Sequence, residues 1–381
     1  MATSIAVAGG WDRRRIAVNE FCEMRVLHAI SGLPKAAGTS VFCAEVCNGL
    51  VRVGHDVTIA VCDPNAKDSC RLDSRVKLVS VDLIIDSTRY TEFDLVHIHA
   101  LWEPVLQRIN KWAHRGNVPV VWSPHGMLTP WALNNKKWKK RLAWWLYQKR
   151  GLAAARLLHA TAASELEDIK RVGLKNDVVV VPLGVDVNDC VEHGKHVEGK
   201  KVLLFVSRVQ KKKGLMNLVE AWARLPREAK QGWCVRIVGP DQEGHTEELK
   251  VRCGQLGALD DFAFVGPKFG EALVAEYAAS DLFVLPTHSE NFGSVVIEAL
   301  SYDVPVICTK GAPWSELETY NCGKWIDIGV EPLVVALKAM MSLSDEDRRR
   351  MGVNGRQLVE MKYTWGAVVK GMVKGYEHLM I

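Results

Sequence analysis

The sequence lacks several features that would assign it to a common protein class. It has no apolar run approaching the about 18–20 residues of a membrane-spanning helix, so none is predicted. Its ten cysteines include no C-x-x-C pair, and Cys308 lies inside the apolar run VPVICT. This pattern favours reduced, buried thiols in a cytosolic protein over a disulfide framework. Cys43 and Cys47 are one helical turn apart and predict core packing rather than metal or redox chemistry.

Other signatures of enzymes are missing as well. No G-x-G-x-x-G follows the first strand-like run, which disfavours a nicotinamide-dependent dehydrogenase. The sequence has no G-x-S-x-G element and no Walker A element. His97 and His99 form H-I-H on a predicted strand, but no series of further ligands follows at other strand ends. A structural or acceptor-binding role is therefore favoured over metal binding.

The N-terminus does not resemble a secretory signal, because its apolar run has about five residues and its charges come afterwards. We expect residues 1–23 to be a disordered extension or the product of a misassigned start codon. The 381 residues are 48% hydrophobic and 24% charged, which is typical of a globular chain. At about 150 residues per domain, two domains are expected.

Short runs rich in Val and Ile alternate with helix-like segments. The predicted strands lie at 24–30, 56–63, 76–82, 94–101, 118–124, 156–162 and 177–184, and then at 201–209, 233–240, 262–267, 281–287, 304–309 and 324–329. Near-continuous apolar strands separated by helices predict βαβ units with parallel sheets covered on both faces.

The strand series breaks once, in the polar stretch 186–200. The sequence predicts an N-terminal domain at 24–190, a linker at 191–200 and a C-terminal domain at 201–360. A last helix is expected within 361–381, and its return to the N-terminal domain is left open. Ligands of such domains bind outside the carboxyl ends of the strands.

The most informative segment is 281–309. A strand there ends at Pro286, a polar loop runs to Gly293, and a helix begins near Ser294. The first amides of a helix carry partial positive charge, and Gly293 allows a ligand close to the backbone. This arrangement suits a phosphate or diphosphate. Glu290 and Glu298 flank it, and carboxylates accept hydroxyl groups of a sugar or a ribose. The alternative is two surface glutamates on an ordinary βα unit.

The segment from Glu290 to Glu298, ENFGSVVIE, resembles the E-x7-E signature of retaining glycosyltransferases of family GT4. The resemblance covers about 24–381. It implies an α/β protein with the GT-B fold, two Rossmann-like parallel-sheet domains facing each other across a cleft. FVSRVQKKKGL, residues 205–215, resembles the family segment that grips the donor diphosphate, here through Arg208 and Lys213. Ser207 replaces the usual glycine there.

Three further elements resemble the family in the expected order. In SPHGM, residues 123–127, the resemblance implies that His125 faces the donor sugar. The loop SGLPKAAGTS, residues 31–40, resembles the glycine-rich loop near the phosphates and the acceptor, of which only Gly38 carries over. In PLGVD, residues 182–186, Leu183 stands where the family has asparagine.

The resemblance implies a cytosolic retaining transferase that moves a sugar from a nucleotide-diphosphate donor to a hydroxyl of a glycan or lipid-linked acceptor. It implies no metal and no cofactor, because cations of the protein stabilise the leaving diphosphate. No nucleic-acid partner is expected. The residues implied in catalysis are Glu290, His125, Arg208 and Lys213; those implied in donor binding are Arg208, Lys213, Asn291, Phe292, Gly293, Ser294 and Glu298.

The stretch 135–150 holds seven basic residues and no acidic one, although the whole chain carries only +5. Trp138, Leu142, Trp145 and Leu146 form an apolar stripe at helical spacing. Lys136, Lys137, Lys139, Lys140 and Arg141 crowd the other positions of its first half. Such a helix can lie on an anionic membrane. Alternatively, its tryptophans pack into the domain, or it grips an acidic or lipid-diphosphate acceptor.

Two other functions remain open at this stage. One is a GT-B epimerase or phosphorylase, and a phosphorylase would need pyridoxal phosphate on a lysine. The other is a non-catalytic membrane-binding module, which would not need Glu290, Arg208 or Lys213. The sequence leaves the donor base and sugar, the acceptor and the linkage undetermined.

Overall fold

The computed structural model describes residues 23–35, 37–67, 69–187 and 199–380. The expected N-terminal extension therefore lies outside the described residues except for residue 23, and the expected linker except for residues 199 and 200. The described chain forms two compact units. One contains the residues up to Leu183 and those from Trp365 onward, and the other contains Gly184–Thr364.

The first unit has a seven-stranded parallel sheet with the order β3-β2-β1-β4-β5-β6-β7. Its strands are β1 (Arg25–Ala29), β2 (Asp56–Val61), β3 (Lys77–Ser80), β4 (Leu95–His99), β5 (Val120–Ser123), β6 (Leu157–Ala160) and β7 (Val178–Val180). Its helices are α1 (Gly38–Arg52), α2 (Val81–Ile85), α3 (Pro104–Arg115), α4 (Pro130–Asn134), α5 (Lys137–Ala143), α6 (Lys149–Ala154), α7 (Ala163–Arg171) and α16 (Trp365–Met380). A 3-10 turn spans Tyr90–Glu92, and a π-helical turn, Trp144–Gln148, joins α5 to α6.

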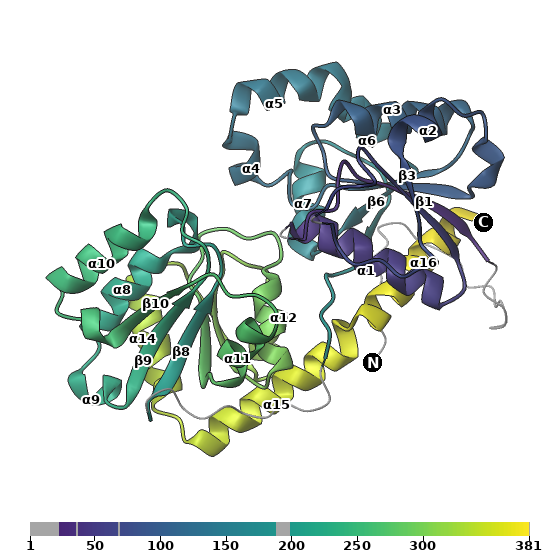
Figure 1. Cartoon of the computed structure of the whole chain (residues 1–381). Coiled ribbons are helices and arrows are strands. Elements are labelled where there is room, and N and C mark those ends of the chain that lie inside the picture. The colour runs from purple at the N-terminus through teal and green to yellow at the C-terminus, as the bar shows by residue number, and fades with distance from the viewer. Residues whose placement is uncertain (1–22, 36, 68, 188–198, 381) are drawn as a thin grey trace. The chain divides into compact units, whose positions relative to one another are not determined.

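Successive residues of a strand point to opposite faces of the sheet, so they belong to two different hydrophobic clusters. Val26 belongs to one apolar cluster with residues of α1 and α16, whereas Leu27 belongs to another that includes residues of α3. In Figure 1 the C-terminal helix α16 lies beside α1, and the two helices pack closely. A Cβ atom at Gly49 of α1 would lie 2.2 Å from a methyl group of Val369.

The second unit has a six-stranded parallel sheet with the order β10-β9-β8-β11-β12-β13. Its strands are β8 (Lys201–Val206), β9 (Trp233–Val238), β10 (Phe262–Gly266), β11 (Leu282–Leu285), β12 (Val306–Thr309) and β13 (Gly323–Ile326). Its helices are α8 (Leu215–Arg224), α9 (Arg227–Lys230), α10 (His245–Gln255), α11 (Glu271–Ala278), α12 (Ser294–Ser301), α13 (Glu316–Thr319), α14 (Val330–Met341) and α15 (Asp345–Lys362), with 3-10 turns at Lys211–Lys213 and Leu259–Asp261. Both sheets follow the 3-2-1-4-5-6 order of doubly wound α/β folds.

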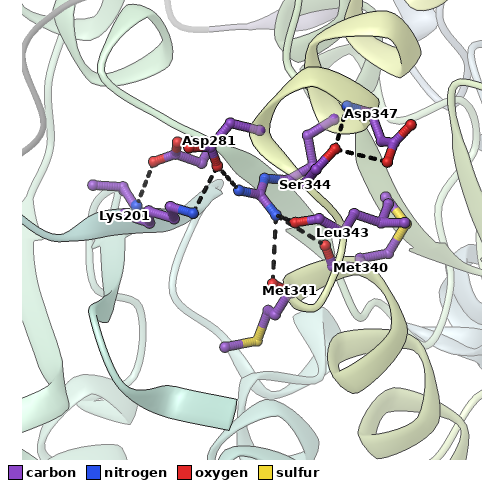
Figure 2. Close-up of polar contacts among 10 residues, drawn as sticks. Lys201, Asp281, Met340, Met341, Leu343, Ser344 and Asp347 are labelled. Carbon is purple, nitrogen blue, oxygen red and sulfur yellow. Dashed lines mark hydrogen bonds and ion pairs between the residues drawn. The ribbon is translucent and has the colours of Figure 1, made fainter. Parts of the chain in front are cut away.

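A buried arginine, Arg348, holds the junction of α14 and α15 together. Figure 2 shows Met340, Met341 and Leu343, whose carbonyl groups accept hydrogen bonds from it. The guanidinium of Arg348 donates to the carbonyl of Leu343 at 2.5 Å and pairs with Asp345. Asp345 also pairs with Lys201, the first residue of β8, at 2.6 Å. The hydroxyl of Ser344 caps α15 by accepting from the amide of Asp347. This network ties the end of the unit's helical layer to the beginning of its central strand.

No helix in the described part of the chain is both long and apolar enough to cross a bilayer. The cysteines that the structure describes are free thiols, and Cys43, Cys47, Cys253, Cys308 and Cys322 are buried.

Candidate functional site

The predicted donor-binding residues follow two neighbouring strands of the second unit. Arg208 and Lys213 lie after β8, and Glu290 and Gly293 lie after β11. Because β8 pairs with both β9 and β11, the strand order reverses there. Loops beyond the carboxyl ends of strands at such a switch point form the usual ligand site of an open α/β sheet.

The two loops are bonded to each other through their backbones. The amide of His288 donates to the carbonyl of Lys212 at 2.9 Å, and the hydroxyl of Thr287 donates to the same carbonyl at 3.2 Å. Gly214 has a φ of +71°, and a Cβ atom there would lie 2.0 Å from the carbonyl oxygen of Pro286. Only glycine permits this approach, so the residues after β8 and β11 are held in one rigid arrangement.

Lys213 and Glu290 form an ion pair across these loops. Their side chains are only 8% and 15% exposed. Loss of either partner would leave the other charge buried and poorly solvated, so replacing one residue alone should destabilise the fold. The structure thus brings together two residues that the sequence assigned to one site, and an anionic ligand would compete with Glu290 for the ammonium group.

Further positive charge surrounds the pair. Arg208 is exposed and forms no ion pair with any residue that the structure describes. Lys212 is half-buried, and burial lowers its pKa; Glu290 opposes this shift, whereas Lys213 and Arg208 add to it. Lys212 is therefore not a freely solvated surface lysine. Lys211, by contrast, is exposed and pairs with Glu248 at 3.0 Å. A bound anion would relieve the crowding of cations around Lys212.

Helix α12 begins beside this cluster. Its N-cap, Gly293, has a φ of +82° and provides no side-chain cap. The preceding carbonyl of Phe292 accepts from the indole of Trp314 at 2.6 Å, and the two rings pack with centroids 5.0 Å apart. Asn291 and Ser294 are half-exposed on either side of this turn. The uncapped end of a helix carries partial positive charge that suits a phosphate.

Glu298 lies within α12 and is held by a residue that the sequence did not indicate. The hydroxyl of Tyr277 donates to its carboxylate at 2.8 Å. Burial raises the pKa of Glu298, although hydrogen bonds from Tyr277 and Ser294 act in the opposite direction. No motif marks Tyr277, because it lies on α11, 21 residues earlier in the chain.

In the first unit, histidines gather where β1 and β4 adjoin, the equivalent switch point. His125 follows β5 with a φ of +52° and is half-buried. Its Nε2 lies 3.1 Å from Nδ1 of His99, whose Nε2 lies 2.9 Å from Nδ1 of His28. Burial, with added effects of His99 and His159, holds the pKa of His125 well below its usual value. His125 is therefore neutral at neutral pH.

Burial lowers the pKa of His97 and of His159, and with both rings neutral a second hydrogen-bonded row has one arrangement of protons. A backbone carbonyl only accepts, so Nε2 of His159 donates to Val181 at 2.8 Å and Nδ1 accepts from Ser123 at 2.7 Å. The hydroxyl oxygen of Ser123 then accepts from Nε2 of His97 at 2.6 Å. Nδ1 of His97 in turn accepts from Tyr376 of α16 at 2.6 Å.

Glu165 was also not indicated by the sequence, and it fixes the turn at His125. Its buried carboxylate accepts from the amide of Gly126 and from the amide and hydroxyl of Thr161. Gly126 has a φ of +73°, so two successive residues are left-handed here. Backbone strain of this kind persists only where neighbouring groups enforce it, as at binding sites.

Two other predicted elements have different surroundings. Gly38 begins α1, has no left-handed φ, and a Cβ atom there would meet nothing within 4 Å. Nothing in the structure therefore requires glycine at this position, and the acceptor-loop role of Gly38 stays a prediction.

The predicted basic helix does not begin at 135. Lys136 is left-handed with a φ of +52°, and α5 begins at Lys137.

Two groups of side chains in the described residues have the spacing of metal ligands. The ligand atoms of His28, Cys43 and Cys47 lie within 4.8 Å of one another, as do those of His28, His97 and His99. In the second group, both ring nitrogens of His97 already have hydrogen-bond partners. One hollow of the first unit, about 790 Å³, lies at the amino ends of β5 and β6, at the opposite edge of the sheet from the histidines.

Two family models match the chain. "Glycosyltransferase Family 4" matches residues 36–189, and "Glycosyl transferases group 1" matches residues 189–358. D-inositol 3-phosphate glycosyltransferase of Nocardia farcinica is 27% identical over 313 residues, which are 74% of this chain and 66% of that protein. The homologous enzyme of Salinispora arenicola is 30% identical over 46% of this chain and 40% of its own length. The chain thus aligns with less than two thirds of these relatives.

Solved structures show the same fold. Anabaena Alr3699/HepE in complex with UDP and glucose has a TM-score of 0.70 at 15% identity, covering 93% of this chain and 100% of that chain. Sucrose-phosphate synthase from Thermosynechococcus elongatus has a TM-score of 0.69 at 18% identity, covering 93% and 99%.

Proposed function

The chain belongs to glycosyltransferase family 4 and has the GT-B fold predicted from its sequence, and from this premise we propose that it transfers a sugar from a nucleotide-diphosphate donor to a hydroxyl group. The observation that carries the proposal is the rigid pair of loops that brings Lys213, Glu290 and the start of α12 together. The proposed acceptor is a glycan or a lipid-linked glycan of a polysaccharide, lipopolysaccharide or glycolipid.

The second unit would bind the donor. Arg208, Lys213 and the amides around Phe292 and Gly293 would hold the diphosphate, with Asn291 and Ser294 beside it. Because the diphosphate gains negative charge as its bond to the sugar breaks, fixed cations stabilise the transition state more than the ground state. These cations would supply the charge that a metal ion provides in other transferases, so we propose a metal-independent reaction.

The two carboxylates would bind hydroxyl groups. Glu290, released from Lys213 by the incoming phosphate, would accept from the donor sugar, and Glu298 would accept from the ribose. We propose that the acceptor oxygen attacks the anomeric carbon on the face that the diphosphate leaves, with its proton passing to a leaving phosphate oxygen. The anomeric configuration is then retained. Neutral His125, fixed by His99 and by Glu165 through Gly126, would contact a sugar hydroxyl.

We propose that the protein acts in the cytoplasm, peripherally at the cytoplasmic face of a membrane. The described cysteines are free thiols and five of them are buried, which supports a reducing compartment. A lipid-linked acceptor would also lie at that face.

Transfer and donor hydrolysis with the wild type and three variants test the proposal. Glu290→Gln and Arg208→Ala are each expected to lower kcat/KM at least about tenfold, the effect of one charge-assisted hydrogen bond. Lys211→Ala is the matched control, since Lys211 is bonded to Glu248 instead. Undiminished turnover of both site variants would refute the assignment. A thermal-shift panel of UDP, GDP and ADP sugars would identify the donor base, because a ligand of the folded state raises Tm.

A further inference from the structure

The outward side of the helical segment after β5 exposes an unusual set of large apolar side chains. Trp138, Leu142, Trp145 and Leu146 are 73%, 54%, 68% and 65% exposed. We call these four residues the tryptophan face. The packing of Trp138 and Trp145 into the domain, one alternative that the sequence left open, is therefore wrong. Contiguous exposed apolar surface of this kind marks an interaction site.

The inward side of the same segment is firmly attached. Trp144 packs on the ring of Trp102, with centroids 6.4 Å apart. The hydroxyl of Tyr147 donates to the carbonyl of Trp102 at 3.1 Å, and the side chain of Gln148 accepts from its amide at 3.0 Å. The tryptophan face is thus held outward by a fixed helix and does not result from a loosely attached segment.

Cations surround the tryptophan face without counter-charges. Lys136, Lys137, Lys139 and Arg141 are exposed, and none forms an ion pair with a residue in the described ranges. Lys140 differs from them. Its ammonium donates to the carbonyl of Ala132 at 2.6 Å and lies 5.7 Å from the ring centre of Trp102. The predicted basic surface therefore consists of four cations, and Lys140 instead supports the helix from within.

We propose that the tryptophan face and its four flanking cations dock the protein on an anionic lipid bilayer. Indole rings favour the boundary between headgroups and acyl chains, where their apolar body and polar N–H are both accommodated. Cations at the same height attract anionic headgroups. An acidic soluble partner would not require two exposed tryptophans, and a purely apolar partner would not favour unpaired cations. The proposal goes beyond the transfer reaction, since no residue of the donor site takes part.

Flotation with vesicles tests the electrostatic part. The full-length protein is expected to float with vesicles of phosphatidylglycerol and phosphatidylcholine and to remain unbound with phosphatidylcholine alone. The triple variant Lys136→Gln, Lys137→Gln, Lys139→Gln should bind roughly a hundredfold more weakly, at about fivefold per cation. The control variant Lys175→Gln, Lys324→Gln, Lys338→Gln removes the same charge from exposed lysines elsewhere and should bind as the wild type does.

Quenching of tryptophan fluorescence by brominated lipids tests the insertion. The wild type is expected to be quenched, and the double variant Trp138→Ser, Trp145→Ser to lose most of that quenching. Phe269→Ser is the control, because Phe269 is also 73% exposed. Circular dichroism checks that the variants fold. If the tryptophan variant does not fold, flotation of the triple lysine variant and its control alone tests the proposal.

Equal binding to neutral and anionic vesicles, or unchanged binding of the lysine variant, would overturn the proposal. Displacement from vesicles by soluble glycerol phosphate would also overturn it, since the surface would then recognise a free phosphate. No donor or acceptor enters these measurements, so their failure would leave the proposed transfer reaction untouched.

Discussion

Lys213 and Glu290, 77 residues apart in the chain, form a nearly buried ion pair between the loops that follow β8 and β11. Their pairing holds together the two loops that we propose bind the donor diphosphate. Removing one partner leaves the other charge buried and unpaired. This lowers the free energy of unfolding by more than the intact pair adds to it.

Lys213→Ala is expected to lower the free energy of unfolding by about 3 kcal/mol. Urea unfolding followed by fluorescence measures this loss. Lys211→Ala should change it by no more than about 0.5 kcal/mol, because the Lys211–Glu248 pair is exposed. The double variant Lys213→Ala, Glu290→Gln should recover part of the loss, and additive losses would contradict a direct pairing.

The raised pKa of Glu298 predicts a pH dependence of stability. Between the ordinary glutamate pKa and the raised value, the folded state keeps a proton that the unfolded state loses, so stability falls as pH rises. Glu298→Gln should remove this fall. Urea unfolding between pH 4.5 and neutrality, with exposed Glu228→Gln as control, measures the difference. Parallel curves for wild type and Glu298→Gln would contradict the assigned shift.

The buried His159 predicts the opposite dependence of stability on pH. Burial lowers the pKa of His159 from 6.5 to about 4, so the unfolded state binds a proton first as pH falls. The stability contributed by neutral His159 is therefore fully present above pH 6.5 and decreases below it, by about 2 kcal/mol at pH 5. His159→Gln should reduce this slope, and exposed His114→Gln should not. Imidazole titration followed by NMR gives the pKa directly, and an ordinary value would contradict the interpretation.

Arg348 provides a test of the fold that is independent of the site. Arg348→Ala removes its hydrogen bonds to the carbonyls at the end of α14 and its pairing with Asp345 (Figure 2). Unsatisfied buried carbonyls should lower the free energy of unfolding by about 2 kcal/mol or more. The adjacent and exposed Arg349→Ala should have little effect. Equal melting temperatures of the two variants would contradict this role of Arg348.

The sequence predicted the strands well, because apolar runs buried on both faces differ clearly from helical segments. Seven and six runs were expected, and the sheets contain seven and six strands. The loop from Thr287 to Gly293 and the helix beginning at Ser294 were also predicted, since strand ends and glycine are local signals. The sequence likewise predicted the stripe of Trp138 and Trp145 but not the side to which it points.

Other features depend on contacts between distant segments and could not be predicted. Tyr277 of α11 meets Glu298 of α12 across 21 residues, and Glu165 meets Gly126 across 39 residues. The start of α5 at Lys137 follows a left-handed Lys136, for which the sequence gives no signal. Lys140 and Lys139 are equivalent in the sequence, yet only Lys140 bonds Ala132.

Calorimetric titration with UDP, GDP and ADP tests most directly whether the loops after β8 and β11 bind a nucleotide diphosphate. At least one of the three is expected to bind the wild type, Arg208→Ala should weaken that binding by about tenfold or more, and Lys211→Ala should leave it within about twofold. Absence of binding by all three nucleotides, or binding that Arg208→Ala leaves unchanged, would contradict the proposed donor site.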